Sequence, residues 1–430
     1  MKKIYLILFC LLINLKVQCQ TITSFFSHID KHSIIAKKGI NLNNKLIFPL
    51  KITKETDVNA GLLFLDNDYN ISDFLIFNGE NNYAINQIIS SKNNSILIAA
   101  EGYSNDNQES LYFLEVFNKS IINQFIFNEN GNELDPFTLL EFNEHKILIG
   151  GFIKSRELIS NSFYNMFNEQ QMIYAGLFSK DGYKDWSLGL KIEGFDKGIC
   201  NKIIRFNNSF ILLAHAHHIK GSITPFIIKM DEYGNIIKMI NLSYERNENI
   251  LSDIIIHNNV LHAVGVINSE NNQFIYSIEL DDQLNINNQN IYTTSKRLSL
   301  SSIDMRNGFL NIYGAAITKD NSYNYMFLNE KNNIMRSYIF GTNKFNFLVQ
   351  NSDDYLIANS FGHNDEYTSS LVLIDNNIIF DEIILSKNIF KLSSTKINKY
   401  EIVNVFQKSN LNPGIKKVKL VSNKELMYKK

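Results

Sequence analysis

Residues 210–237 read FILLAHAHHIKGSITPFIIKMDEYGNII, and the order of segments in this stretch decides the fold. An apolar segment at Ile211–His215 is followed by a polar loop, by a second apolar segment at Pro225–Asp231, and by a turn that leads into Ile236–Leu242. Asn, Asp and Gly between β-branched and aromatic runs are typical of hairpin turns, because these residues tolerate a positive φ. The stretch therefore predicts consecutive antiparallel strands.

Counterparts of the segment Ile211–His215 recur along the whole chain, with starting positions 45 to 64 residues apart. A polar turn precedes most of them, and a third and a fourth strand-like segment follow. Four antiparallel strands in each repeat of this length are typical of a β-propeller blade, whereas the strands of a sandwich do not repeat in fours and solenoid coils are shorter. The apolar segments are Leu46–Leu50, Ile96–Ala100, Ile147–Gly151, Ile211–His215, Leu261–Gly265, Leu310–Gly314, Leu356–Asn359 and Glu401–Asn404.

The eight segments predict an all-β propeller of eight blades, with seven blades as the alternative count. Each apolar segment is hydrophobic nearly throughout, as expected of a middle strand that neighbouring blades cover on both faces. The small residues at the ends of these strands, such as Gly150, Gly151 and Gly265, fit the crowded region near the central channel. The last unit is short, and the strand-like segment Thr21–His28 is a candidate to complete it.

The first 19 residues predict a secretory signal peptide rather than part of the fold. A positive start, Met1–Lys3, precedes the apolar run Ile4–Ile13, which is too short to span a bilayer as a helix. We expect cleavage before Gln20. Acylation of Cys19 is the alternative, although Lys16 and Gln18 depart from a lipoprotein motif. The mature chain, residues 20–430, then forms one propeller domain with an insertion at about 154–172, no membrane span and no internal disulfide.

The residues Ile228, Lys229, Asp231, Gly234, Asn235 and Ile236 carry a resemblance to a known group. Their pattern resembles the repeat of secreted β-propeller proteins from Bacteroidetes-type bacteria. Other repeats keep the turn and lose the glycine, as at Asp281–Asn285 and Asn329–Asn333. Such proteins often carry a C-terminal sorting domain for the type 9 secretion system, and the sequence shows none. The resemblance therefore implies a periplasmic or outer-membrane-associated location in preference to an extracellular one.

Net charge and motifs exclude several classes of function. The formal net charge is −1, from 42 Lys and Arg against 43 Asp and Glu, so the basic surface of a nucleic-acid-binding protein is not expected. No phosphate-binding loop or nucleophile-elbow motif occurs. Cys200 has no His or Asn partner in a recognisable motif, so we expect no catalytic thiol and no cofactor.

Two further groups of residues are candidates for metal binding or acid catalysis. His215 and His217 alternate on one face of a strand and are the candidate metal ligands, although a structural role is expected because no other ligand spacing accompanies them. Paired acids are needed for glycoside hydrolysis, and the pairs here are predicted to be turn formers. These pairs are Asp281–Asp282, Asp353–Asp354 and Asp365–Glu366, and Asp66–Asn70 is likewise expected to be a hairpin turn rather than a calcium loop.

The insertion Lys154–Met172 interrupts the repeat and carries Phe163, Tyr164, Met166 and Phe167. An insertion in a blade loop offers aromatic anchors to a partner, or else packs on the propeller as a short amphipathic helix. We expect a non-catalytic exported scaffold that binds another envelope protein through these four residues, for instance as an accessory of outer-membrane secretion or gliding machinery. The alternative is a protein that binds or degrades a polysaccharide with acids in its channel-facing loops.

Overall fold

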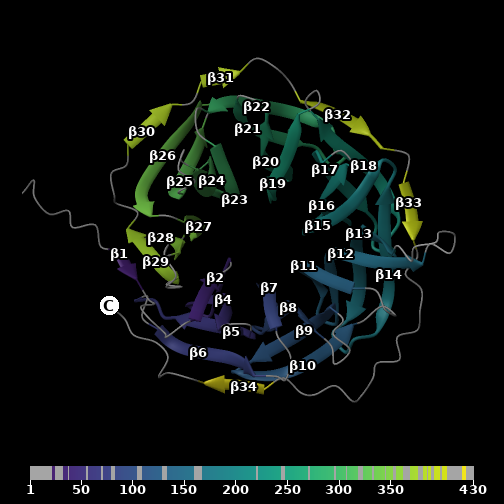
Figure 1. The fold of residues 1–430 in the computed structure, drawn as a ribbon, viewed down its shortest axis with the longest axis vertical. Coiled ribbons are helices and arrows are strands. Elements are labelled where there is room, and N and C mark those ends of the chain that lie inside the picture. Colours follow the sequence, from purple (N-terminus) through teal and green to yellow (C-terminus); the bar gives the residue numbers. More distant parts are fainter. Residues whose placement is uncertain are drawn as a thin grey trace, which may run out of the picture.

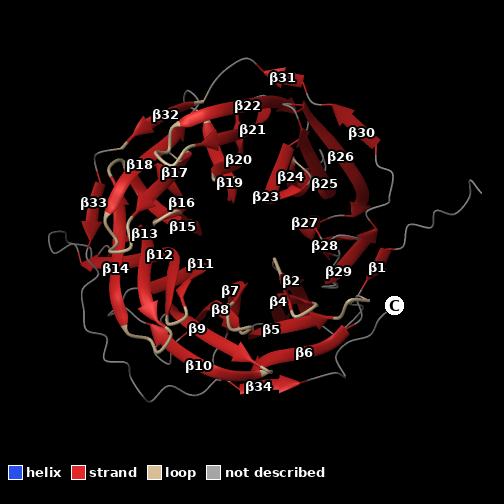
Figure 2. Cartoon of the chain, turned by 180° about the vertical axis from the view of Figure 1, so that it is seen from behind, coloured by secondary structure: helices blue, strands red, loops and turns tan. Residues whose placement is uncertain are grey.

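The fold is described from a computed structural model of the chain. It describes residues 22–24, 32–36, 38–54, 57–68, 71–78, 83–103, 109–127, 133–158, 167–218, 221–243, 247–269, 272–294, 297–306, 308–317, 323–331, 334–343, 345–351, 355–361, 369–375, 381–384, 386–388, 392–397, 400–403 and 419–422. Within these ranges all regular structure is β-strand, and Figure 2 shows strands and loops alone.

The described strands pair into four-stranded antiparallel sets, numbered here 1 to 7 in chain order, which Figure 1 shows around a common centre. In each set the first strand lies innermost. Set 1 consists of β2 (His32–Ala36), β4 (Lys45–Lys54), β5 (Asp57–Leu65) and β6 (Ile71–Asn78), with β3 (Ile40–Leu42) beside β4. Set 2 consists of β7 (Tyr83–Ser90), β8 (Ile96–Tyr103), β9 (Glu109–Phe117) and β10 (Ser120–Phe127). Set 3 consists of β11 (Glu133–Asn143), β12 (Lys146–Leu158), β13 (Phe167–Ser179) and β14 (Lys184–Ile192).

Sets 4 to 6 repeat the same order, and set 7 takes its outermost strand from the start of the chain. Set 4 consists of β15 (Phe195–Phe206), β16 (Ser209–His218), β17 (Ile223–Met230) and β18 (Ile236–Ser243), and set 5 of β19 (Glu248–His257), β20 (Val260–Asn268), β21 (Gln273–Leu280) and β22 (Ile286–Thr294). Set 6 consists of β23 (Arg297–Arg306), β24 (Phe309–Ile317), β25 (Tyr323–Lys331) and β26 (Ile334–Asn343). Set 7 consists of β27 (Phe345–Asn351), β28 (Tyr355–Phe361), β29 (Ser369–Asp375) and β1 (Ile22–Ser24). The fold is therefore all-β and propeller-like, as the sequence predicted.

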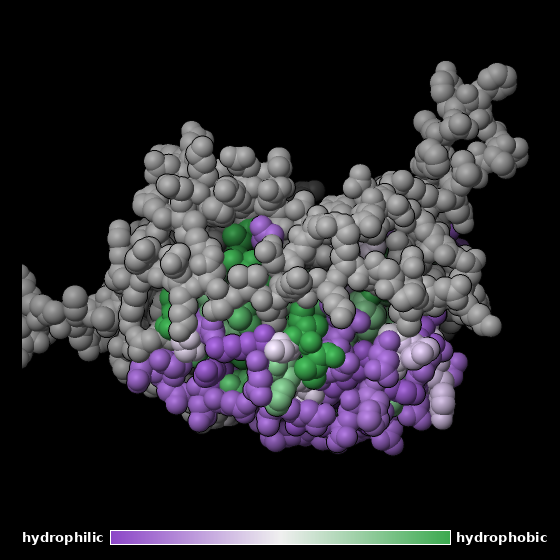
Figure 3. All heavy atoms as spheres, turned by 90° about the horizontal axis from the view of Figure 1, so that it is seen from below, coloured by the Kyte–Doolittle hydropathy of each residue, from purple (hydrophilic) through white to green (hydrophobic). Residues whose placement is uncertain are grey.

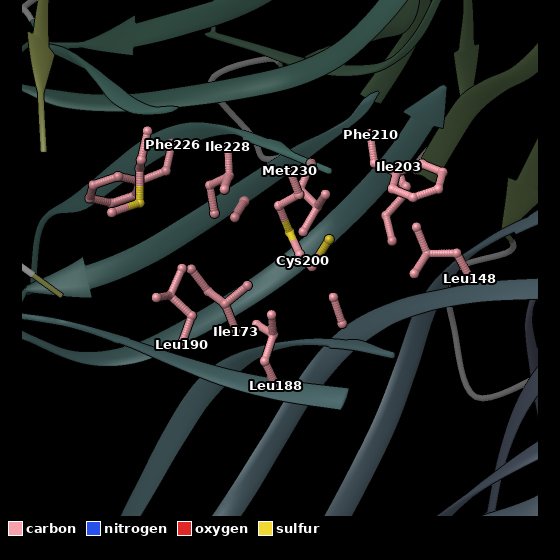
Figure 4. Packing of buried hydrophobic residues seen from close by; sticks show 14 of the residues in the cluster. Leu148, Ile173, Leu188, Leu190, Cys200, Ile203, Phe210, Phe226, Ile228 and Met230 are labelled. Atoms are coloured by element: carbon pink, nitrogen blue, oxygen red, sulfur yellow. The ribbon is translucent and has the colours of Figure 1, made fainter. Parts of the chain in front are cut away.

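The second strand of each set is the apolar segment that the repeat identifies, and in sets 2 to 5 the neighbouring sets cover it on both faces. In β16, Phe210 and Leu212 pack into a core cluster shared with set 3, whereas Ile211 and Leu213 pack into one shared with set 5. Figure 4 shows the first of these clusters, where side chains of sets 3 and 4 face one another. Similar clusters join sets 1 and 2, 2 and 3, and 5 and 6.

The turns between the first two strands use the predicted chemistry. Asn94, Asn207 and Asn258 adopt φ values of 58°, 54° and 48°, and Gly308 has a φ of 75°. Asn and Gly tolerate this left-handed region, which keeps each hairpin tight. The Asn-rich turns are thus confirmed.

Small residues in the second strands are required by the first strand beside them. An ideal Cβ at Gly151 would lie 1.9 Å from the carbonyl oxygen of Asp135, and one at Gly265 would lie 2.3 Å from that of Ile250. Both contacts occur beside a bulge in the first strand, between Pro136 and Thr138 and between Leu251 and Asp253. The bulge presses the inner strand against its neighbour, and only glycine fits there.

The described strands of the C-terminal segment pair with the outer strands of earlier sets instead of with one another. Tyr400–Val403 (β33) pairs with β14 of set 3, and Lys419–Ser422 (β34) pairs with β6 of set 1. Earlier in the segment, β30 (Asp381–Ile384), β31 (Ser386–Asn388) and β32 (Ser393–Lys396) pair with β26, β22 and β18. These five strands, called the belt below, run along the outer edges of sets 6, 5, 4, 3 and 1.

The first strand explains why the belt is available for this role. The N-terminal strand β1 pairs with β29 and supplies the fourth strand of set 7. Thr21–His28 was expected to complete the last unit, and its part Ile22–Ser24 does complete set 7. Because β1 occupies that edge, the residues after β29 are left to pair with the other sets.

No helix within the described ranges is long and apolar enough to span a bilayer. The expected signal peptide, residues 1–19, lies outside the described residues.

Candidate functional site

The insertion extends a hairpin of set 3. Strands β12 and β13 each contain 13 residues, whereas the middle strands of the other sets contain 7 to 10. The inner strand β11 pairs with β12 as far as Lys154, and the pairing of β12 with β13 continues to Leu158 and Phe167. Four extra residues per strand add about 13 Å to the hairpin. The described part of the insertion is therefore β-strand, not the short helix that was the alternative.

The four aromatic and Met anchors are placed only in part. Phe163, Tyr164 and Met166 lie outside the described residues. The backbone of Phe167 begins β13 and pairs with Leu158. Their role in binding a partner stays a prediction.

A pocket of about 510 Å³ opens at the foot of this hairpin, between sets 3 and 4. Its floor is apolar and contains Met172, Ile173, Leu190 and Ile192, which are almost fully buried. The end of β14, the β14–β15 connection and the start of β15 form the rim, which carries the exposed charges of Glu193, Asp196 and Lys197 together with Lys191.

Gln171 joins the hairpin to this pocket. Its backbone pairs with Lys154 in the hairpin and with Lys197 of set 4, and its side-chain amide donates to the carbonyl of Gly198 at 3.4 Å. An apolar floor inside a rim of mixed charge is the anatomy of a protein-binding surface. We call the extended hairpin and this pocket together the hairpin–pocket site.

Both ring nitrogens of His215, one of the two candidate metal ligands, contact groups of the protein. The backbone N–H of Leu251 in set 5 donates to Nε2 at 3.1 Å, and Nδ1 lies 2.6 Å from the side-chain amide nitrogen of Asn201. Both ring nitrogens are thus engaged by protein groups, Nε2 as an acceptor. Burial and the nearby charge of His217 lower the pKa of His215 to about 4. Neither ring nitrogen is free to bind a metal.

No other metal site emerges from the described part of the chain. Groups of three or more His, Cys, Asp or Glu side chains able to hold an ion are absent there. His217 lies two residues along the same strand, paired through its backbone with Lys197 and Ile223.

A series of polar side chains clasps successive inner strands together. Gln87 accepts a hydrogen bond from the N–H of Leu139 in the next set. Thr138 accepts in the same way from the N–H of Ile203 at 3.0 Å. Each acceptor follows a bulge, and positions 87, 138, 202 and 253 are spaced like the repeat itself. Sequence reasoning missed these residues, although alignment of the repeats would have placed them in one column.

Asp253 has the most bonds in this series. Its Oδ1 accepts from the Lys202 ammonium group at 2.5 Å and from the N–H of Ile254 at 2.8 Å. Its Oδ2 accepts from the N–H of Ile303 in set 6 at 2.9 Å. A carboxylate held by three donors in this way is a structural clasp.

Lys38 lies within electrostatic reach of charged residues on three inner strands, β15, β19 and β23. Its side chain is exposed, but partial enclosure by protein lowers its pKa; the charges of Asp253 and Asp304 oppose this shift, and the charge of Lys202 adds to it. Asp304 in turn accepts from Asn311 at 2.8 Å and from the Tyr313 hydroxyl at 3.0 Å.

The acidic turns behave as predicted where they are described. Asp281 Oδ1 accepts from the N–H groups of Gln283 and Asn285, at 2.9 and 2.8 Å. Burial alone would raise the pKa of this carboxyl, but these hydrogen bonds and the charge of Lys238 lower it below the ordinary value. Asp66 Oδ1 accepts from the N–H of Asp68 in the same manner. Asp353, Asp354, Asp365 and Glu366 lie outside the described residues.

The motif that carries the resemblance has a structural explanation. Asp231 accepts from the N–H groups of Tyr233 and Asn235, and Gly234 takes a φ of 87° with the indole of Trp186 packed against it. The Trp186 indole also donates to the carbonyl of Glu232 at 3.0 Å. The motif therefore builds a turn that the preceding set holds in place.

The motif's lysine makes the corresponding contact one set further on. The half-enclosed ammonium of Lys229 donates to the carbonyl of Asp282 at 2.5 Å. In that turn Leu284 replaces glycine at a φ of 57°. The turn is thus kept without its glycine, as expected, and successive sets are linked from turn to turn.

Cys200 is inert in this fold. Its side chain is fully buried in the cluster of Figure 4, and burial raises the pKa of the thiol far above its usual range. A buried thiol of this kind is not a nucleophile.

Comparison with known proteins gives no family assignment. No protein-family profile and no curated protein sequence matches the chain. Among solved structures, the extracellular domains 1–2 of Drosophila Semaphorin 1a match with a TM-score of 0.44 and 8% identity, over 83% of this chain and 88% of theirs. A thermostable family-43 glycoside hydrolase matches with a TM-score of 0.30 and 13% identity, over 58% of this chain and 90% of its own. Likenesses this remote carry no argument about function.

Proposed function

We propose that this chain is an exported, non-catalytic β-propeller that binds another protein of the cell envelope through the hairpin–pocket site. In this proposal the seven four-stranded sets are the seven blades of a closed ring. The pairing of β1 with β29 joins the N-terminal strand Ile22–Ser24 to Ser369–Asp375 of set 7. Closure of this kind gives a rigid disc from whose face the extended hairpin projects.

The single observation that supports partner binding best is the extended hairpin with a pocket at its foot. Its two strands exceed all the other described middle strands in length, and the pocket places an apolar floor beside exposed charges. The core of a protein interface combines apolar anchors with a polar rim in the same way. Phe163, Tyr164, Met166 and Phe167 are proposed as the anchors.

Several observations favour a scaffold over an enzyme. Asp253, Asp304 and Asp281 hold other groups of the protein in defined hydrogen bonds, and His215 bridges two sets. Groups bound in this manner are not available as an acid–base pair. Degradation or binding of a polysaccharide therefore stays the alternative without an observation in its favour.

The proposed location follows from the signal sequence and the stated resemblance. Residues 1–19 direct export, and the chain then acts in the periplasm or at the outer membrane. A role as an accessory of outer-membrane secretion or gliding machinery is part of this proposal.

The test is affinity purification of the full-length protein from its native envelope, beside a variant with a trimmed hairpin. Lys154 and Gln171 are paired, so an Asn-Gly turn can replace residues 155–170 without changing the register. We expect a stoichiometric partner that is lost with the trimmed variant, while the melting temperature stays within a few degrees. Recovery of the chain alone, or of the same partner with both proteins, would overturn the proposal.

A further inference from the structure

The belt shows that outer edges of this fold accept an added strand. Five outer strands, β6, β14, β18, β22 and β26, each pair antiparallel with three or four residues from 381–422. An edge strand presents unpaired N–H and C=O groups, so such a cover satisfies its hydrogen bonds.

The outer strand of set 2 lacks this cover in the described part of the chain. Its sheet ends at β10, which pairs with β9; the belt strand β34 comes close to β10 but pairs with β6. The strand reads SIINQFIF and contains no charged residue. Natural edge strands usually carry charges or proline that prevent pairing with other chains. Strand β10 carries neither, and it therefore retains the properties of an acceptor for an additional strand.

Exposed apolar side chains accompany this edge. Ile122 in β10 is 51% exposed, and Phe117 at the end of β9 is 40% exposed. Figure 3 looks at the side of the molecule on which β6, β10 and β34 lie in Figure 1, and hydrophobic atoms show there between hydrophilic ones.

A pocket of about 480 Å³ adjoins the same turn, between sets 2 and 3. Phe117, Ile122 and Asn123 form its side toward β10. Glu144 and Asp181 line it with exposed carboxylates, and Glu115 and Lys180 line its buried part.

Three carboxylates line this pocket, those of Glu115, Glu144 and Asp181, against one ammonium group, that of Lys180. Lys180 lies between two buried acids, with its ammonium 3.4 Å from Glu115 and 2.9 Å from Glu141. Burial alone would raise the pKa of Glu141, but hydrogen bonds from Ser91, Lys180 and the N–H of Lys92 lower it, so this carboxyl is ionised at neutral pH. One ammonium between two carboxylates leaves the surroundings attractive to a further cation. The apolar rim suits the alkyl stem of a Lys or Arg side chain.

We propose that β10 and this pocket bind an extended segment of a partner protein, which adds a fifth antiparallel strand to set 2 and places a Lys or Arg side chain in the pocket. This inference rests on the proposed function as a partner-binding protein, and it names a second contact on the opposite end of the hairpins from the hairpin–pocket site.

Two peptides from the belt serve as matched probes, because belt strands pair with outer edges of this fold. The basic probe is KVKLVS, residues 417–422, and the acidic probe is DEIILS, residues 381–386. We expect the basic peptide to bind the full-length protein and to slow amide exchange across Ser120–Phe127. The acidic peptide should bind at least about tenfold more weakly, since it meets the carboxylates of the pocket.

Backbone pairing is tested separately from charge. N-methylation of alternate nitrogens of the basic peptide removes the donors on one edge only, so one methylation phase should abolish binding and the other should leave it. On the protein, the double substitution E144K/D181K should weaken the basic peptide by about tenfold. The substitution E232K, on the corresponding turn of set 4, is the matched control and should leave its affinity unchanged.

Three outcomes would overturn the inference. The first is equal amide hydrogen exchange along β10 and along β18, which β32 covers, in the protein without peptide. Residues 404–418 of this chain would then already occupy the edge. Equal binding of the two peptides would show that the charge of the pocket does not contribute to binding. Equal effects of both methylation phases would show that backbone pairing does not contribute. Partner loss on hairpin trimming is measured independently, so failure of either proposal is recognised without the other.

Discussion

At the scale of single residues, the groups that suggest chemistry are mostly used to satisfy the backbone. His215, Asp253 and Asp281 each accept hydrogen bonds from main-chain N–H groups, and two of them reach into a neighbouring set. A buried N–H without a partner costs about 1–3 kcal/mol, so polar side chains that accept from such donors stabilise the packing between sets. Their positions follow from packing between sets, which the sequence pattern alone does not display.

His215 makes the stability of the protein depend on pH. The pKa of His215 is about 4 in the folded chain, against about 6.5 when unfolded, so the unfolded state binds more protons between these values. Stability should therefore fall as the pH drops from about 6.5 to 4, by up to about 3 kcal/mol from this group. Denaturant unfolding at several pH values should show a flatter profile for His215→Asn than for the native chain. Parallel profiles would refute the neutral bridging role.

At the scale of elements, the inner-strand clasps should contribute measurably to stability. Thr138→Val keeps the shape of the side chain but removes the acceptor of the Ile203 N–H. We expect a loss of about 1–3 kcal/mol, because the donor stays buried without a partner. Chemical denaturation measures the loss, and faster amide exchange at Ile203 locates it. An unchanged unfolding midpoint would show that water or another group satisfies this N–H.

The elements that the sequence predicts well are those with local causes. Asn94 and Asn207 mark their turns because a positive φ requires such residues, and β16 reads as a middle strand because both of its faces are apolar. The bulges, the clasp at Gln87 and the pocket below the hairpin were not predicted, since they arise where residues of different repeats meet. The described part of the insertion is a β-hairpin because β12 and β13 keep one antiparallel register as far as the pair Leu158 and Phe167.

At the scale of the whole molecule, the two chain ends decide which edges of the described four-stranded sets are completed or covered. Glu401–Asn404 has the apolar pattern of a middle strand, but Tyr400–Val403 forms an outer fifth strand on set 3. A short strand with alternating side chains suits either position, and the choice depends on β1 having completed set 7.

The belt should protect the outer edges from association. Leu392 packs into the cluster between sets 4 and 5, and the N–H of Ile397 donates to the carbonyl of Met239 at 3.0 Å. Removing residues 377–430 exposes the edges of β6, β14, β18, β22 and β26, which should lower the melting temperature and promote aggregation. Circular dichroism during heating measures the melting temperature and light scattering measures aggregation, with removal of residues 423–430 as the control. Equal scattering from the two truncated proteins would contradict a protective role.

The central claim is that the hairpin–pocket site contacts a partner protein, and site-specific photo-crosslinking in the native envelope tests it most directly. A benzoylphenylalanine at Lys197, on the rim of the pocket, should give a covalent adduct of one defined mass. The same group at Glu232, in a turn at the opposite end of the hairpins, should give none. No adduct from position 197, or equal adducts from both positions, would contradict the account.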